Sequence, residues 1–145
     1  AQPNPDMIII LAGYQNEMDK MLDSNPGLRG RFTHYLHFED YCSEELQEIA
    51  QMRIASRGLK LSLSANEALA DAIGKTLRDK TNGFANARWV EQFADKAICH
   101  TANRVLASHL FTPDYLVTIT PEDIAAAYNE LTIGNNYAKP KIGFA

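Results

Sequence analysis

Residues 7–12 read Met-Ile-Ile-Ile-Leu-Ala and form the longest uninterrupted apolar run of the chain. β-Branched side chains dominate the run, and no polar residue alternates with them, which is typical of a β-strand buried on both faces. Such a strand needs a hydrogen-bonding neighbour at each edge and helices on both faces. The remaining sequence has too few strand-like segments to supply them. We therefore expect residues 7–12 to belong to the later part of a longer α/β domain rather than to a self-contained fold.

Three further elements are expected close to this run. A short helix is predicted at 16–24, where methionine and leucine side chains recur at helical spacing. The segment 25–32, Asn-Pro-Gly-Leu-Arg-Gly-Arg-Phe, is predicted to be a turn and a basic loop, and 33–38 has the propensity of a strand. Arg29 and Arg31 of this loop are either solvated charges or contacts to an anion, because a guanidinium offers a planar fork that suits phosphate.

The chain after residue 42 is predicted to be mostly helical. Apolar stripes, capping residues and helix-stopping glycines mark four helices. The predicted elements are helices at 43–58, 64–82, 86–108 and 120–134, with a very short extended piece at 59–63. On the third helix, Trp89, Phe93 and Leu106 are among the side chains expected to face inward.

The composition indicates a mildly acidic globular chain. Its 145 residues include 14 basic and 18 acidic ones, for a net charge of −4 and a pI near 5.5, which argues against a nucleic-acid binder. No apolar stretch approaches the ~20 residues of a membrane-spanning helix, and no secretory leader begins the sequence. Two cysteines are too few for a disulfide framework and suggest a reducing compartment. We therefore expect a soluble cytoplasmic domain that uses neither nucleic acid nor membrane as a partner.

One segment resembles a phosphate-binding motif without meeting its requirements. Gly74-Lys75-Thr76 is similar to the end of a P-loop, but that motif needs a glycine at position 69, where Leu69 stands. The segment is instead predicted to lie inside a helix. The histidines and cysteines show no metal-ligand spacing, so we expect no metal site.

Another arginine follows Asn86 and Ala87 at the predicted start of the third helix. Arg88 there opposes the helix dipole, which costs from a few tenths of a kcal/mol to about 1 kcal/mol. A paired acid or a bound phosphate would offset that cost. The residues alone leave two interpretations open, namely a tolerated surface arginine or a phosphate contact.

Several segments, taken in order, resemble one protein family. They are 9–14 (Ile-Ile-Leu-Ala-Gly-Tyr), 25–32, 38–41 (Phe-Glu-Asp-Tyr), 43–46 (Ser-Glu-Glu-Leu), 84–88 (Phe-Ala-Asn-Ala-Arg) and 141–144 (Lys-Ile-Gly-Phe). Together they are similar to the CbxX/CfqX-type AAA+ ATPases, which include red-type rubisco activases and stage V sporulation protein K. The segment 84–88 is similar to the family's second-sensor segment, and 141–144 to a domain end in its tandem members.

The resemblance implies an α/β remnant joined to an all-α lid. On this basis residues 1–41 hold the fourth and fifth strands and the arginine-finger loop of a AAA+ core, 42–134 form the helical lid, and 135–145 are a tail or linker. Family members work as rings, commonly hexamers, so a homo-oligomer is implied. The parent protein would couple ATP hydrolysis to the remodelling of a protein partner.

The resemblance also implies roles for individual residues. Arg31 would be the arginine finger that reaches the γ-phosphate on the neighbouring subunit, with Arg29 as the second candidate. Arg88 would be the second-sensor arginine, which contacts nucleotide from the lid of the same subunit. The other nucleotide-binding candidates are Asn86, beside that arginine, and Tyr14 and Asn16, where the first sensor is expected.

Two motifs that hold ATP and Mg²⁺ in this family, the Gly-x-x-x-x-Gly-Lys-Ser/Thr loop and an apolar strand ending in Asp-Glu, do not occur in the 145 residues. ATP and Mg²⁺ are therefore expected to bind the intact parent, and this chain alone is expected neither to bind ATP tightly nor to hydrolyse it. The alternative function is a non-enzymatic helical interaction module or adaptor with an ATPase-derived fold. A helical nucleic-acid-binding domain is a third hypothesis, which the acidic balance disfavours.

Overall fold

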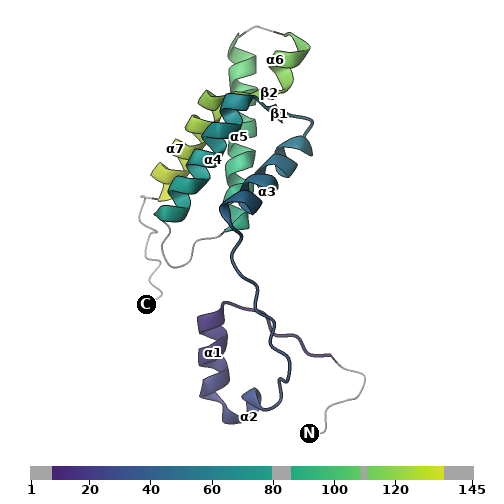
Figure 1. Cartoon of the computed structure of the whole chain (residues 1–145), viewed down its shortest axis with the longest axis vertical. Coiled ribbons are helices and arrows are strands. Elements are labelled where there is room, and N and C mark those ends of the chain that lie inside the picture. Colours follow the sequence, from purple (N-terminus) through teal and green to yellow (C-terminus); the bar gives the residue numbers. More distant parts are fainter. Residues whose placement is uncertain (1–7, 80–85, 109–110, 136–145) are drawn as a thin grey trace, which may run out of the picture. The chain divides into compact units, whose positions relative to one another are not determined.

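The computed structural model describes residues 8–79, 86–108 and 111–135, and over these it is mostly helical (Figure 1). The chain divides into an N-terminal unit, residues 1–39, and a helical unit, residues 40–145. None of the described helices is both long and apolar enough to cross a membrane. In chain order the elements are α1 (Gln15–Ser24), α2 (Pro26–Arg29), α3 (Ser43–Ala55), β1 (Lys60–Leu61), α4 (Leu63–Arg78), α5 (Ala87–Ser108), α6 (Pro113–Val117), β2 (Thr118–Ile119) and α7 (Pro121–Asn135).

In the N-terminal unit, α1 and α2 follow each other with one residue between them. Asn25 caps α2, because its side-chain oxygen accepts a hydrogen bond from the Gly27 N–H at 3.2 Å. Pro26 occupies the first position of α2, where the helix needs no N–H donor. The helix predicted at 16–24 is confirmed, whereas part of the segment 25–32 that was predicted to be a turn is a one-turn helix.

The two strands predicted in the N-terminal unit are wrong for the residues that the structure describes. Residues 8–12 and 33–38 form no strand, and Ile8, Ile10 and Phe38 are 88%, 83% and 87% exposed. A strand exists through hydrogen bonds to a neighbouring strand, and the described part of this unit offers no such neighbour to either segment. The apolar side chains of these two segments are therefore exposed, although the sequence predicted that the first segment would be buried on both faces.

Four helices of the helical unit enclose its hydrophobic core (Figure 1). α5 packs against α3 and α7, and α4 packs against the same two helices, so all four predicted helices are confirmed. The ring of Phe93 lies 5.1 Å from that of Trp89 and 6.2 Å from that of Tyr128, measured between centroids. The largest fully buried side chains are Phe93, Leu46, Ile54, Leu69, Ile73, Ile119, Ile124 and Val90.

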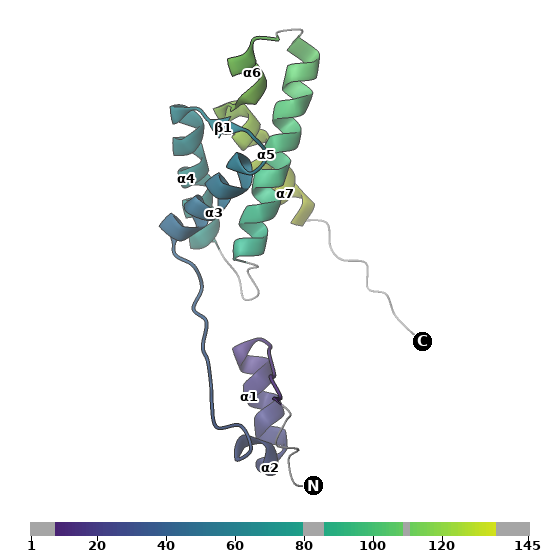
Figure 2. The ribbon, with the colours of Figure 1, turned by 90° about the vertical axis from the view of Figure 1, so that its right-hand side faces the viewer.

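One helix start and one inward-facing residue differ from the prediction. α4 begins at Leu63, one residue before the predicted start, because Ser62 Oγ accepts a hydrogen bond from the Ala65 N–H at 3.1 Å and caps the helix. Leu106 is 71% exposed. The last buried side chain of α5 is Thr101, and beyond it α5 runs past the core beside α6 (Figure 2).

Two short strands join distant parts of the helical unit. β1 and β2 pair in parallel, with Lys60 opposite Thr118 and Leu61 opposite Ile119. The extended piece predicted at 59–63 is confirmed for residues 60–61, whereas residue 63 already belongs to α4. β2 and α6 have no counterpart in the prediction, because two and five residues are too few to show a periodic pattern.

Some predicted features lie outside the described residues. They are residue 7 of the apolar run, the last residues of the helix predicted at 64–82, residues 84–85, and the tail from 136 onward with its segment 141–144.

Candidate functional site

Arg31 lies two residues after the end of α2, beyond its C-cap Gly30, and its side chain is exposed. Its backbone N–H donates to the Leu28 carbonyl at 2.9 Å, which fixes the chain at this point. No hydrogen-bond acceptor or carboxylate within the described residues pairs with its side chain. The whole fork of N–H donors is therefore available for an anion.

Arg29, two residues earlier, is occupied by the acids of α1. Its Nε and Nη2 atoms donate to Asp23 Oδ1 at 3.1 and 2.7 Å, and Nη2 lies 3.5 Å from Asp19 Oδ1. The hydrogen bond to Asp23 raises the pKa of Arg29 above its ordinary value. Its carbonyl also accepts a hydrogen bond from the Tyr35 hydroxyl at 3.1 Å. Arg29 thus braces α2 against α1, and an incoming anion would have to compete with two carboxylates.

Tyr14 and Asn16, the first-sensor candidates, lie at the start of α1. Tyr14 has extended backbone, and its carbonyl accepts hydrogen bonds from the Glu17 and Met18 N–H groups at 3.0 and 2.9 Å. Its side chain is 77% exposed, and Asn16 is exposed in the first turn. Both side chains could reach a ligand at this end of the helix, so the geometry favours neither of them as the first sensor.

Arg88 lies in the first turn of α5, where its side chain is exposed. The next two residues, Trp89 and Val90, are buried in the core and fix the start of the helix. In the described ranges Arg88 has no acidic partner that would offset its unfavourable place at the positive end of the helix dipole. A negatively charged ligand near the start of α5 would supply that offset.

Asn86 immediately precedes α5 and adopts left-handed backbone with φ 45°. Its carbonyl accepts hydrogen bonds from the Trp89 N–H at 3.1 Å and the Val90 N–H at 3.3 Å, which closes the first turn. Its side-chain amide nitrogen and oxygen are buried and find no partner among the described residues. In this conformation Asn86 therefore shapes the start of α5 and does not present its amide to solvent.

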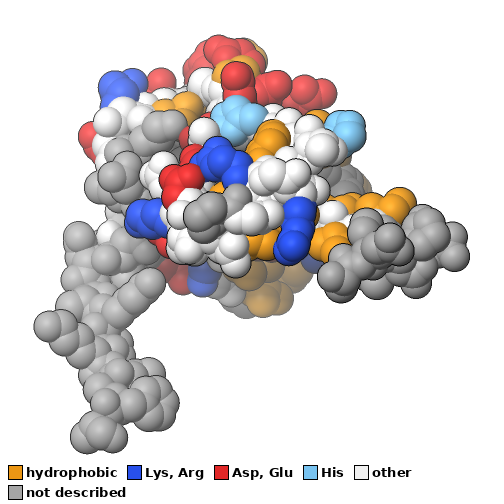
Figure 3. Space-filling view, turned by 90° about the horizontal axis from the view of Figure 1, so that it is seen from below, with side chains coloured by type: hydrophobic (Ala, Val, Ile, Leu, Met, Phe, Trp, Pro, Cys, Tyr) orange, Lys and Arg blue, Asp and Glu red, His pale blue; other side chains and the backbone are white. Residues whose placement is uncertain are grey.

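The predicted site residues fall into two sets. Arg29, Arg31, Tyr14 and Asn16 belong to the N-terminal unit, and Asn86 and Arg88 to the helical unit. Among the side chains that Figure 3 draws in colour, Lys and Arg are interspersed with acidic, hydrophobic and other side chains.

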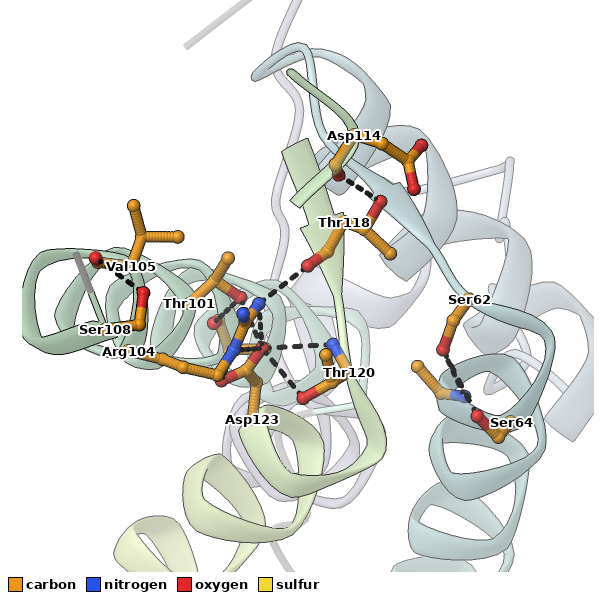
Figure 4. Close-up of polar contacts among 12 residues, drawn as sticks. Ser62, Ser64, Thr101, Arg104, Val105, Ser108, Asp114, Thr118, Thr120 and Asp123 are labelled. Atoms are coloured by element: carbon orange, nitrogen blue, oxygen red, sulfur yellow. Dashed lines mark hydrogen bonds and ion pairs between the residues drawn. The ribbon is translucent and has the colours of Figure 1, made fainter. Parts of the chain in front are cut away.

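A buried polar cluster in the helical unit has no counterpart in the prediction (Figure 4). Asp123 of α7, which is 3% exposed, accepts hydrogen bonds from Arg104 Nε at 3.1 Å and from Thr101 Oγ1 and the Thr120 N–H at 3.0 Å. Arg104 also donates to the Thr118 carbonyl of β2 at 2.7 Å. The cluster ties α5, β2 and α7 together through one carboxylate and one guanidinium.

Hydrogen bonding sets the protonation state of this cluster. Burial by itself would raise the pKa of Asp123, but the hydrogen bonds from Arg104, Thr120 and Thr101 outweigh it and hold the pKa below its ordinary value. The bond to Asp123 raises the pKa of Arg104, whose guanidinium carbon lies 4.5 Å from the centre of the Tyr115 ring. Protein groups pair with the carboxylate and with Nε and Nη2 of the guanidinium, whereas Nη1 is buried without a partner among the described residues. Because the two charges pair with each other, we assign the cluster a structural role.

An apolar groove of about 320 Å³ lies beside α5 and α6. Its lining consists of Leu59, Ile98, Thr101, Ala102, Val105, Leu106 and Leu116. The Thr101 hydroxyl already donates within the polar cluster, so the groove offers no free acid, base or nucleophile. In the part of the chain that the structure describes, no three His, Cys, Asp or Glu side chains gather as a metal site would require.

Comparison with known protein families identifies the helical unit. Residues 42–133 match the family described as the AAA lid domain. The segment begins at the residue before α3 and ends within α7, so it covers all four core helices.

Individual relatives show the same kinship over a longer stretch. The chain is 40% identical over 121 residues to a CfxQ homolog of Trieres chinensis, 38% identical over 124 residues to CbbX of Cereibacter sphaeroides, and 34% identical over 124 residues to plasmid-encoded CbxX of Cupriavidus necator. These matches cover 82–84% of the chain and 38–41% of each relative. The chain thus spans about two fifths of the length of these relatives, and the similarity extends beyond 42–133.

Proposed function

The chain belongs to the AAA lid domain family, as the C-terminal lid portion of a CbxX/CfxQ-type AAA+ ATPase, and from this premise we propose that it supplies two arginine contacts to ATP. In this proposal Arg31 is the arginine finger and Arg88 the second-sensor arginine. The complete protein couples ATP hydrolysis to the remodelling of a protein partner.

One observation carries the proposal. Arg31 and Arg88 are both exposed and without a partner among the described residues, whereas Arg29 is held by Asp23 and Asp19. A guanidinium that is to stabilise phosphate charge has to be free of protein carboxylates. This contrast supports Arg31 over Arg29 as the finger, and it keeps Arg29 as the residue that shapes the loop.

The two arginines act on different subunits in this proposal. Arg31 reaches the γ-phosphate bound to a neighbouring subunit, which requires a homo-oligomeric ring, and we propose a hexamer. Arg88 contacts nucleotide bound to its own subunit from the lid, with Asn86 at its side. Tyr14 or Asn16 is the first sensor. The low cysteine content supports a cytoplasmic setting.

ATP and Mg²⁺ bind the complete protein in this proposal. The residues here include neither a P-loop nor a strand ending in Asp-Glu, and the described residues hold no set of carboxylates that fits Mg²⁺. When bound, Mg²⁺ neutralises phosphate charge. The guanidinium groups of this chain neutralise part of that phosphate charge in this proposal. Other residues of the complete protein bind the phosphates and supply the metal ligands.

Replacing Arg88 with alanine is expected to lower ATP turnover by the complete protein about 10- to 100-fold, the loss associated with one hydrogen bond between charged groups. The measurement is steady-state ATPase activity as a function of ATP concentration. Arg78→Ala serves as the control, because Arg78 is also an exposed arginine, in the last turn of α4. This substitution is expected to leave turnover unchanged.

The outcome also separates an ATPase from an interaction module. An adaptor with an ATPase-derived fold would keep its partner binding through both Arg31→Ala and Arg88→Ala, and no turnover would depend on either residue. Unchanged ATPase activity in Arg88→Ala would contradict the second-sensor role.

A further inference from the structure

Asn86 adopts a backbone conformation that L-residues avoid. With φ at 45°, it is the one non-glycine residue with positive φ within the described residues. The left-handed region crowds Cβ against the following carbonyl, and asparagine tolerates it better than alanine or most other residues. Glycine adopts it without a steric penalty.

The side chain of Asn86 adds a second unfavourable feature at the same position. Its amide nitrogen and oxygen are buried, and neither has a hydrogen-bond partner in the described part of the chain. A buried amide without partners destabilises the folded state. Strained backbone and unsatisfied polar groups persist where surrounding structure enforces them, and such positions cluster at functional sites.

The surroundings show what enforces this conformation. Trp89 and Val90 are buried in the core, and their N–H groups donate to the Asn86 carbonyl at 3.1 and 3.3 Å. The core therefore fixes the third and fourth peptide groups after Asn86, and the left-handed turn at Asn86 sets how the chain enters α5. Arg88 lies between these fixed points, with its side chain exposed and unpaired among the described residues.

We propose that Asn86 is a positioning residue: its left-handed backbone orients the first turn of α5 so that the Arg88 guanidinium points to its phosphate. The proposal rests on the second-sensor role proposed for Arg88. In this proposal Asn86 affects nucleotide binding only by orienting Arg88, and its own buried amide does not contact the nucleotide.

A double-mutant cycle in the complete protein tests this role, with kcat/KM for ATP as the readout. Asn86→Ala is expected to lower kcat/KM about fivefold, because alanine disfavours the left-handed region. Asn86→Gly is expected to retain at least about half of the wild-type value, because glycine accepts that region freely. In an Arg88→Ala background, Asn86→Ala is expected to have no further effect, since the residue through which Asn86 acts is gone.

Controls separate positioning from folding and from the underlying proposal. Asn103→Ala, an exposed asparagine further along α5, is expected to leave kcat/KM unchanged. Far-UV circular dichroism of the complete protein reports whether each variant folds. If Asn86→Ala does not fold, an Asn86→Gly variant that loses kcat/KM about fivefold still overturns the proposal.

Two further results overturn the positioning role alone. They are an Asn86→Ala variant as active as wild type, and an Asn86→Ala substitution that lowers kcat/KM by the same factor with and without Arg88. Unchanged activity in Arg88→Ala by itself overturns the second-sensor role instead, so the two failures are distinguishable.

Discussion

Arg31→Ala is expected to lower ATP turnover by the complete protein about 10³-fold, the largest effect of any substitution in this chain. An arginine finger neutralises the charge that develops on the transferred phosphoryl group, and alanine leaves that charge uncompensated. Arg31 is suited to this task because its side chain is exposed and finds no carboxylate among the described residues. Steady-state ATPase assays, with nucleotide affinity measured in parallel, determine the effect.

Three further variants sharpen this result. Arg31→Lys retains the charge without the planar fork, so it is expected to recover only part of the lost turnover. Lys20→Ala removes a cation of the same unit that pairs with Glu17, and it is expected to leave turnover unchanged. If Arg29→Ala abolished turnover while Arg31→Ala preserved it, the finger would be Arg29 and the assignment to Arg31 would be wrong.

Asp123→Asn is expected to destabilise the helical unit by about 3 kcal/mol at neutral pH. The substitution removes the carboxylate that pairs with Arg104 in the described part of the chain, and it leaves that guanidinium charge in a site that is largely closed to water. For a unit of this size, the change corresponds to a fall in melting temperature of more than about 10 °C. Trp89 lies in the same unit and is the single tryptophan of the chain, so its fluorescence during urea unfolding follows this unit.

The effect of Asp123→Asn is expected to depend on pH in a defined direction. Hydrogen bonds from Arg104, Thr120 and Thr101 overcome burial and lower the pKa of Asp123 in the folded state, whereas an unfolded aspartate has a pKa of about 3.9. The carboxylate therefore contributes its full stabilisation above about pH 4 and loses it as the pH falls through the folded-state pKa. The stability gap between wild type and Asp123→Asn should narrow in acid.

The matched control for this pair of measurements is Asp71→Asn, which changes an exposed aspartate of α4. We expect it to alter the free energy of unfolding by less than about 0.5 kcal/mol at every pH. A gap between wild type and Asp123→Asn that stayed constant from pH 7 into acid would contradict the role given to the ionised carboxylate.

The four core helices were predictable because the information that forms them is local. Apolar spacing and capping residues lie within each helix, as the cap at Ser62 shows even though it shifts the start of α4. The strands predicted at 8–12 and 33–38 do not form. Local sequence cannot decide such a case, because a strand depends on a partner strand elsewhere in space. The apolar character of residues 8–12 does not by itself produce burial.

The candidate site was predictable as a set of residues but not as a set of contacts. The resemblance ranks Arg31 before Arg29, but it does not predict the 2.7 Å contact with Asp23 that occupies Arg29. The pair of Asp123 and Arg104 was missed for a similar reason. Asp123 fits the pattern of an acid at a helix start, and nothing local links it to an arginine 19 positions earlier.

The reading frame upstream of Ala1, read from the native transcript, tests the proposed ATPase most directly. We predict a Gly-x-x-x-x-Gly-Lys-Ser/Thr motif in that frame, followed by an apolar strand that ends in Asp-Glu, because Arg31 and Arg88 need a bound nucleotide to act on. A start codon close to Ala1, with neither motif encoded, would contradict the ATPase and favour the interaction module.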